Sequence, residues 1–196
     1  MKIKTHIALF FAASLVLALS SCNLSKQDDN KNKKTEIINN TMPLANDSIA
    51  YYEELLSKDS MNVKNRIALA INYYTAHNYD EAIYHLLIAT RIESKNLEAL
   101  ITLGNAYYDS HQFENAIEYY QKALAIDSKN IDVRCDMATC YIYTKNSEKA
   151  IPLLKKNLTI NKNHPQTHYN LSTAYKELGK TKEAEEEKAI FEKLSK

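Results

Sequence analysis

The sequence predicts an all-α protein in which pairs of helices stack on one another along the chain. Three whole copies of a 34-residue unit occupy residues 63–96, 97–130 and 131–164, and a fourth copy, two positions shorter, occupies residues 165–196. Within each copy, positions 4, 7, 8 and 11 have the spacing of one helix face, and positions 20, 24 and 27 repeat that spacing for a second helix. Only two glycines and three prolines occur in 196 residues, a composition that favours helices.

Three positions of the unit keep the same kind of residue in all four copies. Position 8 is small, position 11 is tyrosine and position 20 is alanine: Ala70, Gly104, Ala138 and Ser172; Tyr73, Tyr107, Tyr141 and Tyr175; and Ala82, Ala116, Ala150 and Ala184. Small residues at positions 8 and 20 let the two helices of a copy approach closely, because larger side chains would hold their axes apart. We expect the tyrosine to fill the space beside this crossing, with its hydroxyl near a polar edge.

The copy at residues 97–130, LEALITLGNAYYDSHQFENAIEYYQKALAIDSKN, resembles the consensus of the tetratricopeptide repeat (TPR), a family with the same period. The resemblance covers residues 63–196 and implies a right-handed α-solenoid of about four helix-turn-helix TPR units. Residues 48–58 fit positions 20 to 30 of a preceding copy, so we expect an N-terminal capping helix within residues 47–62. The fourth copy has a charged second helix with Lys188 at position 24, as expected of a C-terminal cap.

Residues 1–21 have the composition of a secretory signal peptide. Two lysines precede an apolar run of 13 residues at 7–19, which is too short to span a bilayer comfortably. The sequence LSSC at residues 19–22 resembles the lipobox of bacterial lipoproteins, which implies cleavage before Cys22 and acylation of this residue. Residues 22–46 would then be the lipidated cysteine and a flexible tether rich in Asn, Lys and Asp. An ordinary secretory signal with a chance cysteine, or an uncleaved anchor, is the alternative.

These features predict a protein of the bacterial cell envelope that a lipid holds to the membrane. Asn23 stands where an aspartate retains lipoproteins at the inner membrane of some diderm bacteria. The outer membrane is therefore favoured, on its periplasmic face or at the cell surface. The net charge is +1, and removal of residues 1–21, which carry two lysines and no acid, leaves 23 basic and 24 acidic residues, or −1. This balance does not attract nucleic acid.

The two cysteines of the third copy do not predict a disulfide or a catalytic nucleophile. Cys135 and Cys140 lie five residues apart on one expected helix, so their side chains point about 140° away from each other. Cys140 occupies a position that is alanine in two other copies, which indicates packing. A nucleophile needs a base and an orienting group nearby, and the sequence suggests neither. We expect free thiols.

The histidines do not predict a metal site. His77 and His111 both occupy position 15, where we interpret them as turn residues between paired helices. His164 and His168 have a spacing that can bind zinc on a helix, but Pro165 lies between them and no third ligand is evident. With no phosphate loop or triad in the sequence, we expect neither a cofactor nor an enzyme.

By the geometry of the TPR family, positions 2, 5, 9 and 12 of each first helix line a concave face. The predicted partner-binding residues on it are Lys64, Ile67, Ile71, Tyr74, Ile101, Asn105, Tyr108, Cys135, Thr139, Tyr169 and Lys176. An apolar and aromatic floor with a polar rim suits an extended peptide or a partner helix. The residues that clamp a C-terminal carboxylate in chaperone-binding members are replaced by Ile67, Ile71, Asp132 and Asp136, so we expect no binding of that ligand class.

The resemblance thus implies an adaptor or scaffold that binds proteins during assembly or recruitment of envelope complexes. A second hypothesis is a module that recruits an enzyme, such as a cell-wall hydrolase. A third, from another class, is a surface-exposed carbohydrate-binding lipoprotein that uses the tyrosines of the concave face.

Overall fold

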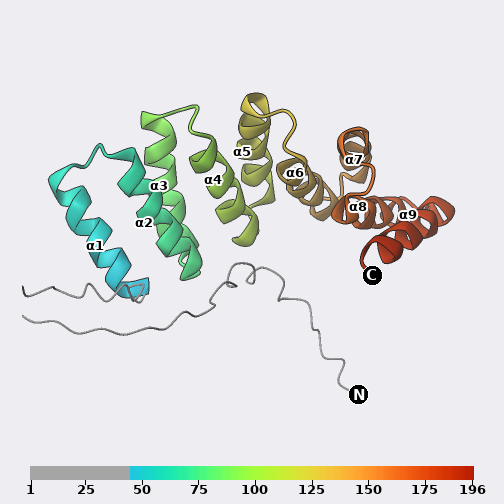
Figure 1. Cartoon of the computed structure of the whole chain (residues 1–196), viewed down its shortest axis with the longest axis horizontal. Coiled ribbons are helices and arrows are strands. Elements are labelled where there is room, and N and C mark those ends of the chain that lie inside the picture. The colour runs from blue at the N-terminus through green and yellow to red at the C-terminus, as the bar shows by residue number, and fades with distance from the viewer. Residues whose placement is uncertain (1–44) are drawn as a thin grey trace, which may run out of the picture. The chain divides into compact units, whose positions relative to one another are not determined.

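The computed structural model describes residues 45–196, in which the secondary structure consists of helices that pack side by side in chain order (Figure 1). They are α1 (Ala45–Lys58), α2 (Val63–Thr75), α3 (Tyr79–Ile92), α4 (Leu97–Asp109), α5 (Phe113–Ile126), α6 (Ile131–Tyr143), α7 (Ser147–Ile160), α8 (Pro165–Glu177) and α9 (Thr181–Leu194). The expected all-α solenoid of helix pairs is confirmed. The predicted signal peptide, Cys22 and nearly all of the tether lie outside the described residues. None of the helices α1 to α9 has the length and apolar character needed to cross a membrane.

The first helices of three copies begin at an asparagine cap. The side-chain oxygens of Asn62, Asn96 and Asn130 each accept a hydrogen bond, at 3.0 Å, from the backbone N–H three residues later. This bond satisfies one of the N–H groups that have no partner at a helix start. In the fourth copy, Pro165 occupies the first turn of α8, where its missing N–H costs nothing.

The turn inside each copy contains one residue in the left-handed region of backbone space. These residues occupy position 15: His77 (φ 60°), His111 (φ 62°), Lys145 (φ 61°) and Gly179 (φ 71°). The next residue donates its backbone N–H to a carbonyl five residues earlier, as Asn78 does to Tyr73 at 2.9 Å, which closes the C-terminus of the first helix. The interpretation of both histidines as turn residues is confirmed.

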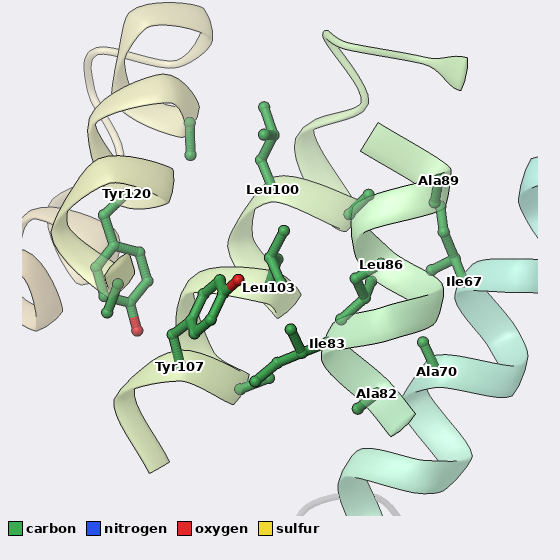
Figure 2. Packing of buried hydrophobic residues seen from close by; sticks show 14 of the residues in the cluster. Ile67, Ala70, Ala82, Ile83, Leu86, Ala89, Leu100, Leu103, Tyr107 and Tyr120 are labelled. Atoms are coloured by element: carbon green, nitrogen blue, oxygen red, sulfur yellow. The ribbon is translucent and has the colours of Figure 1, made fainter. Parts of the chain in front are cut away.

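The core lies where the small residues bring the paired helices together. Ala70, Ala82, Ala116, Ala138 and Ala150 are fully buried, as expected for close crossings. Figure 2 shows Ala70 of α2 near Ala82 of α3, and side chains of α3 pointing toward Leu103 and Tyr107 of α4. At position 24, Lys188 is exposed on α9, in keeping with its place in the last copy.

The second copy departs from its neighbours at one pair of positions in the core. Position 8 is Gly104, and position 24 is Tyr120 rather than leucine. Tyr120 is 1% exposed, and a Cβ atom on Gly104 would lie only 2.5 Å from its Cε1 atom. The glycine therefore makes room for the larger ring, whose hydroxyl donates to Asn105 Oδ1 at 2.8 Å.

Candidate partner-binding surface

The predicted concave residues come from the four first helices, α2, α4, α6 and α8, and differ in exposure. Lys64, Tyr169 and Lys176 are exposed; Ile71, Tyr74, Ile101, Asn105, Tyr108 and Thr139 are partly buried. Ile67 and Cys135 are 4% and 2% exposed, so these two side chains support the surface from within rather than reach a partner. The contact role of the other nine stays a prediction.

Two hollows gather predicted residues at the two ends of this set. Lys64, Ile67 and Ile71 of α2 line a hollow of about 270 Å³ together with Glu93, Asn96 and Glu98. Tyr169 and Lys176 of α8 line a second one, of about 520 Å³, together with residues of α9 that include Phe191. The Tyr169 and Phe191 rings are 5.3 Å apart between centroids.

Between these hollows, tyrosines from successive copies meet side chains of the next helix pair. The Tyr74 hydroxyl donates to Asp109 Oδ2 at 2.5 Å, which links α2 to the end of α4. The Tyr108 ring packs at 5.8 Å from Phe113 and 6.1 Å from Tyr143, and those two rings stack at 4.9 Å. Burial raises the pKa of both Tyr74 and Tyr108, and the nearby charge of Asp136 raises each further. Both tyrosines therefore stay neutral and lie close to carboxylates.

Three carboxylates, Asp109, Asp132 and Asp136, influence one another near the middle of the surface. The pKa of Asp136 on α6 is raised from 3.8 to about 6. Burial is the largest cause, and the negative charges of Asp132 and Asp109 add to it. Among the ion pairs of residues 45–196, neither Asp109 nor Asp136 takes part, while Asp132 contacts His164 at 3.2 Å. In the sequence analysis, Asp132 and Asp136 appeared only as residues that replace a carboxylate clamp, and Asp109 was not indicated. Asp132 and Asp136 are four residues apart on α6, but Asp109 belongs to the preceding copy, so its influence on them is not visible in a local pattern.

The polar residues of the face are held by bonds from neighbouring helices. Asn105 accepts the Tyr120 hydroxyl, as described above. The Thr139 hydroxyl donates to the Cys135 carbonyl at 2.9 Å and accepts the side-chain amide of Asn170 of α8, also at 2.9 Å. These residues are thus fixed in orientation before any partner arrives, which lowers the entropic cost of binding.

The structure also places a cysteine, a histidine and an aspartate in series, which the sequence did not suggest. Cys135 Sγ lies 3.9 Å from His164 Nδ1, and His164 Nε2 lies 3.2 Å from Asp132 Oδ1. However, Cys135 is almost fully buried, and this burial raises the pKa of its thiol to about 11. The reactive thiolate is therefore scarce near neutral pH. The Cys135 sulfur is also in contact with Thr167 Oγ1 at 3.3 Å and with Asn157 Nδ2 at 3.4 Å. This arrangement is unsuited to nucleophilic catalysis.

The two histidines with zinc-binding spacing have separate protein partners. His168 contacts Glu187 Oε2 at 2.5 Å and the Lys162 carbonyl at 2.9 Å, while His164 contacts Thr167 Oγ1 at 2.8 Å. In residues 45–196 no three His, Cys, Asp or Glu side chains are grouped as metal ligands. Cys135 and Cys140 are free buried thiols, as the helix geometry predicted.

The helix pairs, their 34-residue spacing and the surface that their first helices share define a helical-repeat protein of the TPR type. The chain belongs to the TPR family represented by the model described as the fourth ARM domain of tetratricopeptide repeat protein 21, which matches residues 97–196. Among curated proteins, none matches this chain.

Solved structures of other TPR proteins share the fold. A crystal structure of MamA superposes with a TM-score of 0.73 at 22% sequence identity, covering 77% of this chain and 88% of that one. A double mutant of MamA gives a TM-score of 0.74 at 12% identity, covering 78% and 86%. YrrB, described as a TPR protein with an unusual peptide-binding site, gives 0.71 at 19% identity, covering 76% and 77%. At these identities the likeness is one of fold.

Proposed function

We propose that this protein is a lipid-anchored adaptor that holds a segment of a partner protein on the concave face of its TPR units at the bacterial cell envelope. Its role is the assembly or recruitment of envelope complexes, with the outer membrane as the favoured location. Family membership supports a binding role, as does the fold shared with YrrB, a protein described as having a peptide-binding site. The sequence LSSC at residues 19–22 supports the anchor.

The observation that carries the binding proposal is the middle of the surface, where tyrosines and carboxylates lie together. Tyr74 and Tyr108 offer partly exposed aromatic area, while Asp109 and Asp136 are carboxylates without an ion pair among the described residues. Crowding like charges at a partly buried place is unfavourable, because each charge opposes ionisation of the others. A cationic side chain of a partner would relieve this repulsion and would also pack favourably against tyrosine rings.

The partner segment is therefore expected to place a lysine or arginine over Asp109 and Asp136 and apolar side chains in the hollow formed by α2. Lys64 and Lys176 are the exposed cations at the two ends of the predicted set, so acidic residues of the segment would face outward along it. This pattern fits a short extended or helical protein segment. Nucleic-acid binding relies on lysines and arginines that contact phosphates, whereas the middle of this surface carries carboxylates.

The binding proposal is tested by retention of a partner in cells that produce the full-length protein. After cross-linking, the wild-type protein is purified and its bound proteins are compared with those of the Tyr74→Ala/Tyr108→Ala variant. Tyr84→Ala is the matched control, because Tyr84 is an exposed tyrosine on α3, which is the second helix of the first copy. We expect a bound protein to be lost from the double variant and kept by the control. Unchanged protein partners together with lost retention on glycans would instead favour the carbohydrate-binding alternative.

The anchor is tested separately through Cys22. We expect Cys22→Ala to abolish incorporation of a labelled fatty acid and to release the protein from the membrane fraction. Cys140→Ala is the matched control, because alanine occupies the equivalent position in two other copies. A Cys22→Ala variant that keeps its label and its membrane association contradicts the anchoring proposal.

A further inference from the structure

A polar residue of the first helix closes the space beneath the connecting loop in three of the four copies. At position 4, one side-chain nitrogen meets the backbone carbonyl six residues earlier: Arg66 to Ser60, Arg134 to Ser128, and His168 to Lys162. Each of these side chains also bonds the second helix of its own copy: Arg66 to His85 at 3.3 Å, Arg134 to Asn157 at 2.6 Å, and His168 to Glu187 at 2.5 Å. The loop is thereby tied to the helix pair that follows it.

The second copy has Leu100 at this position, and the corresponding space is open. Leu100 has no polar group with which to reach Ser94, the loop residue equivalent to Ser60 and Ser128. A cavity of about 580 Å³ lies here between α3 and α5, with Leu100 and Ser94 in its lining. A volume of this size is typical of small-molecule sites. Leu100, in place of the polar residue of the other three copies, is thus one sequence difference that accompanies this cavity.

The lining of this cavity combines apolar and cationic residues. Leu87, Leu100, Tyr119 and Ile126 are its large apolar members, and Ile126 is 44% exposed. Arg91, Lys95 and Lys122 are the charged residues of the lining, which contains no carboxylate.

One of these three cations is already engaged and two are available. Lys122 pairs with Glu118 at 2.6 Å and lies 4.3 Å above the Tyr119 ring. Within residues 45–196, Arg91 and Lys95 belong to no ion pair. A guanidinium beside an ammonium favours an oxygen anion that accepts several charge-assisted hydrogen bonds.

We propose that this cavity binds a small amphiphilic carboxylate, of which a fatty acid is the simplest example. The apolar body lies against Leu87, Tyr119 and Ile126, with the buried Leu100 beneath them, and the carboxylate contacts Arg91 and Lys95. The residues that line the cavity are not among those assigned to the concave face. Binding at this cavity is therefore independent of partner binding on the concave face.

Isothermal titration of the full-length protein with decanoate tests the inference, with decanol as the uncharged arm. We expect saturable one-to-one binding of decanoate and at least about tenfold weaker binding of decanol, because the alcohol lacks the charge-assisted bonds. Arg91→Glu/Lys95→Glu should weaken decanoate binding by about tenfold or more. Lys129→Glu changes the residue equivalent to Lys95 in the next copy, where Arg134 fills the space, and should leave the affinity unchanged.

A second variant tests the role of the missing polar residue. Leu100→Arg introduces the residue that the first and third copies carry at this position and should close the cavity, with loss of decanoate binding. Circular dichroism is measured alongside to establish that the helices remain. Equal binding of decanoate and decanol, or wild-type affinity in Arg91→Glu/Lys95→Glu, would overturn the proposal. The charge-reversal pair decides the matter even where Leu100→Arg does not fold, because both altered residues are at the surface.

Discussion

The close approach of Gly104 to Tyr120 allows a sharp test of how this solenoid is packed. Gly104→Ala would place a methyl carbon 2.5 and 2.7 Å from two carbons of the Tyr120 ring, whereas favourable carbon contacts lie at about 3.5–4.0 Å. The ring has little room to move, since it is buried and its hydroxyl is bound to Asn105. Overpacking of this kind costs about 1–3 kcal/mol.

Two further effects set the expected size of the change. Alanine favours a helix by about 0.8–1.0 kcal/mol over glycine. Displacement of the ring would weaken the bond between Tyr120 and Asn105, which contributes about 1 kcal/mol. These two effects nearly cancel, so we expect Gly104→Ala to lower the free energy of unfolding by about 1–3 kcal/mol.

The other copies indicate the compensating change. The corresponding pairs are Ala70 with Leu86 and Ala138 with Leu154. In the Tyr120→Leu background, Gly104→Ala should therefore cost nothing or stabilise the protein by up to about 1 kcal/mol. Urea unfolding of the full-length wild type, both single variants and the double variant, followed by circular dichroism at 222 nm, gives the coupling energy. Additive effects, or a Gly104→Ala variant as stable as the wild type, would refute this account of the packing.

Three further predictions concern the acidic centre, a turn and a helix cap. Asp136→Asn should raise the free energy of unfolding by about 1–3 kcal/mol at neutral pH, because the folded-state pKa of about 6 lies above that of the unfolded chain. The penalty of the ionised carboxyl is absent below about pH 4 and full above about pH 6, so urea midpoints of variant and wild type should converge in acid. Gly179→Ala should cost about 1 kcal/mol in thermal unfolding from its φ of 71° alone, since no atom lies within 4 Å of the added carbon. Asn96→Ala should cost about 1 kcal/mol in urea unfolding through loss of the cap of α4, whereas the exposed Asn115→Ala should have little effect.

Each of these predictions has a clear contrary result. A stabilising effect of Asp136→Asn that persists unchanged at pH 4 would show that the carboxyl is not strained by ionisation. A Gly179→Ala variant with wild-type stability would mean that the turn relaxes out of the left-handed region. Equal costs for Asn96→Ala and Asn115→Ala would remove the distinction between a capping and a surface asparagine.

The features that the sequence predicted are those that recur every 34 residues. Small side chains at helix crossings and the turn residues His77 and His111 are under the same packing constraint in every copy, so the repeat itself identifies them. The asparagine caps also recur, at Asn96 and Asn130, but the prediction from the repeat did not include them. An asparagine directly before the first residue of a predicted helix indicates an N-terminal cap.

The features that the sequence did not predict depend on departures from the repeat or on contacts between copies. Gly104 and Tyr120 fit each other in the core, but in the sequence each is only a departure from the residue that other copies have at the same position. Asp109 and Asp136 belong to different copies, and their mutual influence exists only once the second and third copies are stacked. The same holds for the cavity at Leu100, because its opening is apparent only against the bonds that Arg66 and Arg134 make. The structural differences between copies lie where the common pattern is broken.

Binding of a partner protein on the concave face can be observed by site-specific photo-cross-linking in living cells. A photoreactive phenylalanine analogue replaces Tyr108 in one full-length variant and Tyr84, on α3, in another. We predict a discrete protein adduct from position 108 and none from position 84, and we predict that Asp109→Asn/Asp136→Asn removes the adduct. The same adduct from both positions, or an adduct at position 108 that is indifferent to the loss of both carboxylates, would contradict the account.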